Sequence, residues 1–161
     1  MERPIEASTL VSVPLDRVGR LLQDDPTVVL PNPTAIIIAG VCRDVVVTLD
    51  DALADGERII VPLSWHAAEH PKLFPTFLGE LIADAWLAGT RLTMAGTYWV
   101  PLGVIGRFGD GLIGRRLAHE ALRDVVAGAA ARIEIALDGD VLHAQDRDIT
   151  VVESTSIPLA T

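Results

Sequence analysis

The chain has 161 residues, half of them hydrophobic, and carries a formal net charge of −9 from 22 acidic and 13 basic side chains. This length fits one domain that buries a hydrophobic core of its own. The acidic surplus repels phosphate backbones and anionic lipid headgroups, so nucleic acid and acidic membrane surfaces are not expected as partners.

The N-terminal part is predicted to form one strand followed by short helices. Residues 5–13 are rich in β-branched side chains, alternate in part, and stop at Pro14. Leucine and valine then recur at helical spacing over 15–22, where a proline suits the start of a helix. Three prolines within 24–33 prevent one continuous helix there and leave room only for a short turn of helix near 27–30.

Five strand-length segments follow, rich in Val, Ile, Leu, Thr or aromatic residues. They cover residues 35–39, 44–49, 57–64, 76–86 and 90–100. Turn residues such as Gly40 and Gly56 separate several of them. Regular spacing without intervening helices predicts an antiparallel meander. The fourth segment stays open, because its sequence also fits a helix.

A long C-terminal helix is predicted from about Asp110 to Leu137, with Asp110 as a helix-capping residue. Its apolar residues recur every three or four positions and form one stripe of Leu117, Ala121, Leu122, Val125, Ala129 and Ile133. The pattern fades after Leu137. We therefore expect a domain over residues 1–137 and a polar tail over 138–161, which is either disordered or adds a strand at 150–153.

The sequence contains no pattern typical of secretion or membrane insertion. Cys42 is the only cysteine, so an intrachain disulfide is excluded. The first residues lack the basic and apolar regions of a signal peptide. The longest apolar runs fall far short of the roughly 18 residues that span a bilayer. We expect a cytoplasmic protein.

A strand, short broken helices, a strand meander and one long helix follow each other in the order typical of the helix-grip fold. Segment 13–22 (VPLDRVGRLL) is similar to the point where the first strand turns at a proline into a helix in that fold. Segment 89–98 (GTRLTMAGTY) is similar to the last long strand of many bacterial members, and so is the 101–103 turn followed by Gly106, Asp110 and a long helix.

Over residues 5–135 the chain thus resembles the START-related SRPBCC superfamily, which contains polyketide cyclases, lipid-transfer domains and birch-pollen-type allergens. The resemblance implies an α+β fold in which a curved antiparallel β-sheet wraps around a long C-terminal α-helix, with two short helices after the first strand. It also implies a cavity between sheet and helix that accepts lipids, polyketides or other apolar ligands. It supplies no universal catalytic residue.

The aromatic residues give the first candidate site, since all seven lie between residues 65 and 108. Adjacent Tyr98 and Trp99 must face opposite sides of a regular strand. Ordinary core packing is one interpretation of this group. In the other, some of these side chains line the cavity and the Tyr98 hydroxyl is a polar anchor. The candidate ligand-binding residues are Trp65, Trp86, Tyr98, Trp99, Leu117, Ala121 and Val125.

Three residues are candidates for catalysis: His119, Tyr98 and His66. The string His66-Ala67-Ala68-Glu69-His70 matches the H-x-x-E-H pattern of zinc proteases, which requires a helix. Prolines 62 and 71 leave barely two turns for one, so we interpret residues 65–74 as a polar loop at the cavity mouth and expect no metal. His119 has a pKa suited to acid–base catalysis if it faces the cavity, although a lone helical histidine is more often a surface or boundary residue.

Three functions therefore remain open. The favoured one is binding of a small hydrophobic ligand, such as a lipid or polyketide, between sheet and C-terminal helix, without a cofactor. The alternative is a polyketide cyclase or aromatase that uses the same cavity. The third is a homodimeric interaction module without a ligand.

Overall fold

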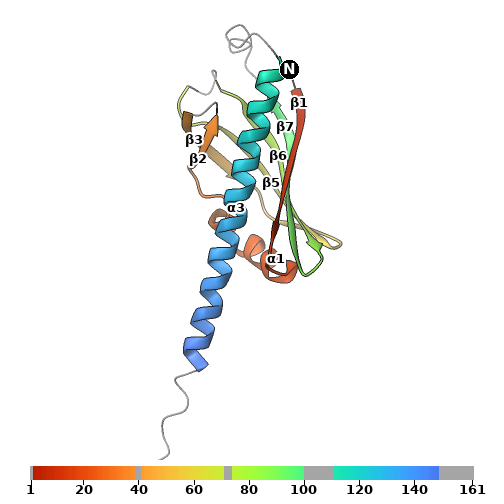
Figure 1. Ribbon diagram of the computed structural model, residues 1–161, viewed down its shortest axis with the longest axis vertical. Coiled ribbons are helices and arrows are strands. Elements are labelled where there is room, and N and C mark those ends of the chain that lie inside the picture. Colours follow the sequence, from red (N-terminus) through yellow and green to blue (C-terminus); the bar gives the residue numbers. More distant parts are fainter. Residues whose placement is uncertain (1, 39–40, 71–73, 100–110, 149–161) are drawn as a thin grey trace, which may run out of the picture.

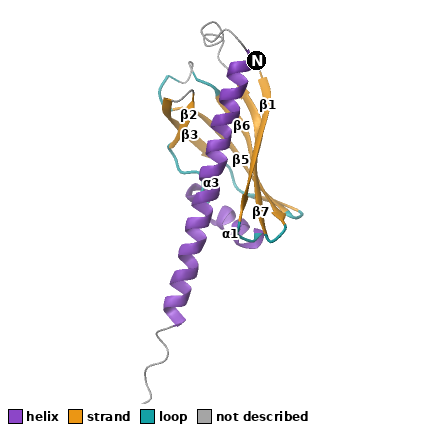
Figure 2. Cartoon of the chain, in the orientation of Figure 1, coloured by secondary structure: helices purple, strands orange, loops and turns teal. Residues whose placement is uncertain are grey.

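The computed structural model describes residues 2–38, 41–70, 74–99 and 111–148. A curled sheet lies against one side of the long helix α3, and the short helix α1 lies at one end of the sheet (Figures 1 and 2). In chain order the elements are β1 (Glu2–Val11), α1 (Leu15–Asp24), the 3-10 helix η1 (Pro26–Val28), β2 (Thr34–Ile38), β3 (Val41–Leu49), β4 (Leu53–Asp55), β5 (Arg58–Ala67), β6 (Thr76–Trp86), β7 (Gly89–Trp99) and α3 (Gly111–Asp148).

The sheet is antiparallel and has the strand order β1-β7-β6-β5-β3-β2, with the short β4 paired to β5. From β2 to β7, strands that are adjacent in the sheet are also close in sequence, as expected of a meander. β1 joins at the far side and pairs with β7 along its whole length, from Glu2 opposite Trp99 to Val11 opposite Thr90. The α+β helix-grip fold class is therefore confirmed.

Most predicted elements are present, and the structure adds two results about the strands. The ambiguous segment is strand β6, because β5 and β7 pair with it on both sides and supply the backbone hydrogen bonds that a helix would otherwise make internally. Strand β4 was missed. It consists of three exposed residues before a two-residue turn at Gly56, so it offers no hydrophobic pattern to read.

The core lies between the sheet and α3. Alternate residues of each strand are buried on the face toward the helix, for example Leu92 and Met94 in β7. α3 buries a stripe that includes Leu122, Val126 and Ile133, in agreement with the predicted apolar stripe. Each such side chain, once fully buried, stabilises the fold by roughly 1.5–3 kcal/mol.

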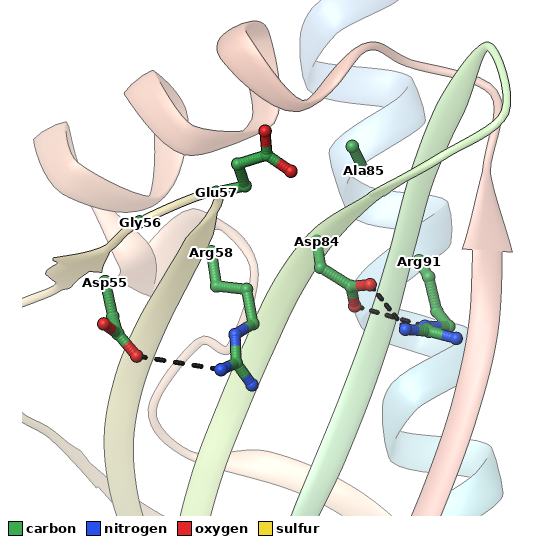
Figure 3. A pocket seen from close by; sticks show the side chains of 7 residues that line it. All are labelled: Asp55, Gly56, Glu57, Arg58, Asp84, Ala85 and Arg91. Atoms are coloured by element: carbon green, nitrogen blue, oxygen red, sulfur yellow. Dashed lines mark hydrogen bonds and ion pairs between the residues drawn. The ribbon is translucent and has the colours of Figure 1, made fainter.

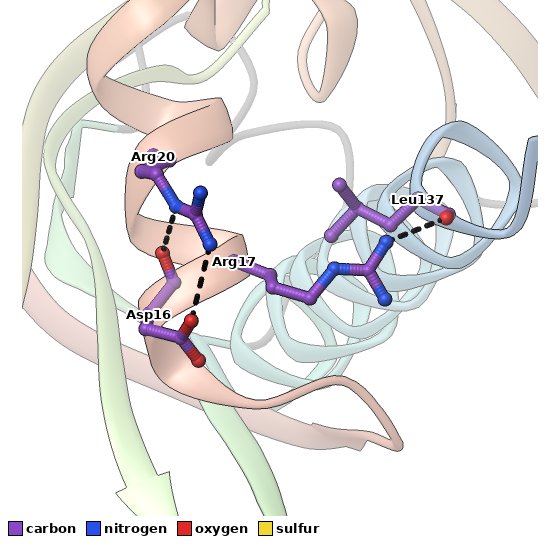
Figure 4. A network of polar contacts seen from close by, with 4 residues as sticks. All are labelled: Asp16, Arg17, Arg20 and Leu137. Carbon is purple, nitrogen blue, oxygen red and sulfur yellow. Dashed lines mark hydrogen bonds and ion pairs between the residues drawn. The ribbon is translucent and has the colours of Figure 1, made fainter. Parts of the chain in front are cut away.

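Helix α3 continues well past its predicted end. At Leu137, the last residue of the predicted helix, the Arg17 side chain donates a hydrogen bond of 2.8 Å to the backbone carbonyl (Figure 4). The helix nevertheless runs to Asp148 and projects away from the sheet (Figure 1). The expected end at Leu137 is wrong for the helix, because backbone hydrogen bonds can continue a helix where the hydrophobic periodicity of the sequence fades. The domain boundary there stays a prediction.

Two further expectations, the Asp110 cap and a strand at 150–153, fall outside the described residues. Among the described helices, none combines the length and apolar character that crossing a bilayer requires.

Candidate functional site

The inner face of the sheet, the one toward α3, has two unlike ends. We call the upper end the one where β5 and β7 finish and β3 and β6 begin, at the top of Figure 1. At the lower end, α1 and η1 cover the sheet with the buried side chains of Val18, Leu22 and Val29. Gly19 lets α1 approach β5 closely, since a Cβ there would lie 3.1 Å from the Ile59 Cγ1 atom. The lower end is therefore closed by packed apolar side chains.

Toward the upper end, three aromatic side chains form a row across neighbouring strands. Trp65 of β5 is the direct partner of Phe77 of β6, which is the direct partner of Tyr98 of β7. Their exposed fractions are 7%, 2% and 4%, respectively. The Trp65 and Phe77 rings stack with centroids 4.1 Å apart and planes 15° from parallel. We call Trp65, Phe77 and Tyr98 the aromatic row.

A pair of glycines lies beside this row on the same face. Gly79 of β6 is directly opposite Gly96 of β7. A Cβ on Gly79 would lie 2.6 Å from Phe77 Cζ, and one on Gly96 would lie 2.7 Å from the same atom. The Phe77 ring thus extends over the two glycines and covers backbone that glycine would leave bare. Phe77 was not among the predicted site residues, although a glycine two residues after an aromatic strand residue can indicate such a close approach.

The Tyr98 hydroxyl differs from the other buried hydroxyls. The buried polar residues of the described core are Thr34 and Thr90, whose hydroxyls donate to the carbonyls of Pro31 and Val13. Within the described part of the chain, the Tyr98 hydroxyl makes no hydrogen bond, and no polar side-chain atom is both fully buried and unpaired. The Tyr98 hydroxyl therefore keeps accessible surface although its ring is buried.

Two of the predicted ligand-binding residues lie on the part of helix α3 that packs against the sheet. Ala121 and Val125 are both buried there. His119 is half-buried, three residues before the buried Leu122, and therefore lies on the sheet-facing side of the helix. The side chain of Leu117 is outside the described part of the structure.

Two of the predicted ligand-binding residues lie on the outer face of the sheet instead. Trp86 is 45% exposed, and the Arg91 guanidinium carbon lies 4.8 Å from the centre of its ring. Trp99 follows Tyr98 along β7 and so faces outward. Their strands were placed correctly, but Trp86 stands an odd number of residues from Phe77 and alternation sends its side chain outward. These two side chains therefore do not border the space between the sheet and α3.

The histidine string is neither a helix nor entirely a loop. Strand β5 runs to Ala67, so His66 is an exposed strand residue on the outer face, and the predicted loop at 65–74 begins too early. The backbone turns at His70, which has a φ of 52°. The H-x-x-E-H pattern therefore lacks the helix that would bring two histidines onto one metal. Nowhere in the described ranges do three His, Cys, Asp or Glu side chains gather into a potential metal site.

A pocket of about 550 Å³ opens on the outer side of the sheet, at the ends of the β4–β5 and β6–β7 hairpins (Figure 3). Arg91 donates two hydrogen bonds to the Asp84 carboxylate, of 3.2 Å and 2.5 Å, and this pairing raises the pKa of Arg91 above its ordinary value. Arg58 lies 3.8 Å from Asp55 across the same opening. These mutually compensated charges make the pocket polar, which does not suit an apolar ligand. No sequence motif indicated this pocket.

Similar folds occur among solved structures, although no protein-family model matches the chain and no curated protein sequence matches it significantly. The di-domain ARO/CYC StfQ from the steffimycin biosynthetic pathway aligns with 88% of this chain and 52% of its own at 13% identity, with a TM-score of 0.55. The chain thus spans about half of that protein.

Two more distant likenesses have lower scores. Truncated norcoclaurine synthase from Thalictrum flavum aligns over 85% of this chain and 94% of its own, at 12% identity and a TM-score of 0.49. TTHA0849 from Thermus thermophilus aligns over 83% and 99%, at 17% identity and a TM-score of 0.46. The curled antiparallel sheet, the long C-terminal helix that packs against it and the likeness to StfQ together give the conclusion that this chain has a helix-grip fold.

Proposed function

We propose that the protein binds a small hydrophobic molecule at the upper end of the inner face, between the aromatic row and the part of α3 that carries Ala121 and Val125. One observation carries the proposal. A buried row of three stacked or adjacent rings ends in the Tyr98 hydroxyl, which the described part of the protein does not use for a hydrogen bond. Apolar walls with a single placed polar group are typical of small-molecule sites.

The chemistry of the inner face supports this reading. Its buried side chains in the described part of the chain are apolar apart from the Tyr98 phenol and two threonines, whose hydroxyls are already paired within the protein. A ligand there gains mainly from removal of apolar surface from water, at about 25 cal/mol per Å². The Tyr98 hydroxyl then orients a carbonyl or hydroxyl group of the ligand by one hydrogen bond.

The closed lower end supports access from the upper end. Val18, Leu22 and Val29 fill the space beside α1 and η1. Opening that end would require breaking apolar packing, which costs several kcal/mol for the side chains involved. Among the described helices, none but α3 covers the inner face beside the aromatic row.

Fluorescence of a protein with one tryptophan tests the proposal. Trp86→Phe combined with Trp99→Phe leaves Trp65 as the only tryptophan. Titration with the uncharged probe N-phenyl-1-naphthylamine is expected to quench Trp65 and enhance probe emission with a shared saturation curve. A control protein that keeps Trp86 and contains Trp65→Phe and Trp99→Phe should show probe enhancement with little tryptophan quenching.

The polar anchor is tested separately with Tyr98→Phe. This variant should bind 1-naphthol about threefold to tenfold more weakly, the value of one hydrogen bond, and naphthalene unchanged. Native mass spectrometry of the purified protein measures whether it forms a dimer. If no probe binds in the titrations and the measured mass equals two chains, the protein is an interaction module and the proposed function is wrong.

A second candidate function is a cyclase that uses the same space, favoured by the position of His119 on the sheet-facing side of α3. A half-buried histidine on this side of the helix can transfer protons to and from a bound polyketide-like chain. Incubating a bound oligoketide with wild-type protein and with His119→Ala distinguishes the two functions. A loss of water from the ligand that depends on His119 supports catalysis, whereas an unchanged ligand supports binding alone.

A further inference from the structure

We propose that the bound molecule carries a carboxylate, and that Arg43 at the upper end of the inner face binds it. This inference rests on the proposed function and adds the class of ligand, an apolar molecule with one anionic end. Arg43 was not among the residues that the sequence indicated.

The register of the sheet assigns Arg43 to the inner face. In the β2–β3 pair, Arg43 is directly opposite Ile36, whose side chain is buried on that face. Two residues further along β3, Val45 is buried and lies opposite the buried Ala67. Arg43 is itself exposed. It therefore stands where the apolar inner face ends and solvent begins.

An aromatic contact holds the guanidinium at this edge. The Arg43 guanidinium carbon lies 5.1 Å from the centre of the Phe74 ring, within the range of a cation–π interaction. Phe74 is half-buried and precedes β6, the strand that carries Phe77. The contact thus connects Arg43 to the strand at the centre of the aromatic row. A stacked guanidinium keeps its N–H edge free for an acceptor.

The charge of Arg43 is not neutralised by the described part of the chain. Its neighbour Asp44 lies opposite the exposed Ala35, on the other face of the sheet. Several other arginines do pair with a carboxylate, for example Arg20 with Asp16 and Arg91 with Asp84. Arg43 forms no ion pair with any described residue, in a chain that has 22 acidic side chains and 13 basic ones.

The distance between Arg43 and the aromatic row sets the length of a ligand that can reach both. Arg43 stands four residues beyond the level of Trp65 along paired strands β3 and β5, which corresponds to about 13 Å. An apolar body resting on the aromatic row and extending toward the upper end therefore brings a terminal carboxylate to the guanidinium. Arginine binds a carboxylate through two parallel N–H···O hydrogen bonds. The net charge of −9 repels anions, so a guanidinium at the edge of the inner face directs the anionic end.

Competition between matched ligands tests the inference. Decanoate, methyl decanoate and 1-decanol share one apolar chain and differ in charge, and each is used to displace N-phenyl-1-naphthylamine. For wild-type protein we expect decanoate to bind about fivefold to tenfold more tightly than its methyl ester, as a solvent-exposed charged hydrogen-bonded pair allows. Higher salt should reduce this preference.

Arg43→Gln should remove the preference and leave the affinity for methyl decanoate unchanged. The control is Arg20→Gln, because Arg20 is exposed on α1 and pairs with Asp16. This control should keep the wild-type preference. Circular dichroism of each variant confirms that the fold is retained.

The contrary results are distinct for the two proposals. Equal affinity of wild-type protein for the three ligands, or a preference that persists in Arg43→Gln, overturns the role of Arg43 and leaves apolar binding intact. Failure of the probe and of all three ligands to bind overturns the proposed function itself.

Discussion

The Trp65 ring stacks on the Phe77 ring with 4.1 Å between centroids, and the Phe77 ring in turn lies over the glycine pair formed by Gly79 and Gly96. The two rings and the two glycines therefore lie next to each other on the same face of the sheet. This arrangement gives that part of the inner face an aromatic surface. The stability of the sheet should therefore depend both on the rings and on the absence of side chains at the two glycines.

Trp65→Ala is expected to lower the free energy of unfolding by about 3–5 kcal/mol, because it removes a buried ring and leaves Phe77 exposed. Trp86→Ala should cost less than about 1 kcal/mol, since that ring is 45% exposed and loses mainly its contact with Arg91. Urea denaturation monitored by circular dichroism measures both. Equal losses for the two variants would contradict the assignment of inner and outer faces.

Gly96→Ala is expected to destabilise the protein by about 1–3 kcal/mol, because the new methyl group would overlap Phe77 and the backbone of β6. Gly128→Ala is the matched control within α3, where the added Cβ meets only the flexible end of Arg132. This second variant should raise stability by up to about 1 kcal/mol through helix propensity. Thermal unfolding distinguishes the two, and a stabilising effect of Gly96→Ala would refute the packing of Phe77 on the glycines.

Leu87→Asn is expected to stabilise the β6–β7 hairpin. Leu87 has a φ of 51°, which bulky residues rarely adopt, and it is 96% exposed, so it gains little from its own packing. Asparagine tolerates this conformation better and should raise the melting temperature by about 2–4 °C, equivalent to roughly 1 kcal/mol. Ala88→Asn beside it, where φ is not positive, is the control and should have no comparable effect.

Arg17→Gln is expected to lower the free energy of unfolding by about 1–3 kcal/mol, because the partly buried Leu137 carbonyl loses a charged donor at 2.8 Å. Amide hydrogen exchange should increase where α1 meets α3. Arg20→Gln on the same helix removes only an exposed ion pair with Asp16 and should cost less than about 0.5 kcal/mol. If both variants lose equal stability, the contact drawn in Figure 4 does not join the helices.

The order and kind of most elements could be predicted from the sequence, because they depend on local patterns. Prolines delimit β1 and α1, the apolar stripe defines α3 up to Leu137, and turn residues separate the strands of the meander. Two features without a local sequence pattern were not predicted. The exposed β4 has no hydrophobic alternation, and the sequence of the last part of α3 has no apolar stripe.

The candidate site was predictable only in part, for a different reason. The sequence indicated which strands carry aromatic residues, and Trp65 and Tyr98 do lie on the inner face. Which face each side chain takes depends on the register between strands, and a shift of one residue reverses it. Trp86 and Trp99 were misplaced for that reason.

Hydrophobic periodicity and turn residues act over a few positions, so they suffice to predict an α+β chain with a strand meander and a long amphipathic helix. Pairing in three dimensions is needed to bring Trp65, Phe77 and Tyr98 into one row, with Gly79 opposite Gly96 beside it. The same holds for Arg43, which lies beside Phe74 at the upper end of the inner face. These residues are brought together by pairing between strands, and no local pattern records which residues will be opposite one another.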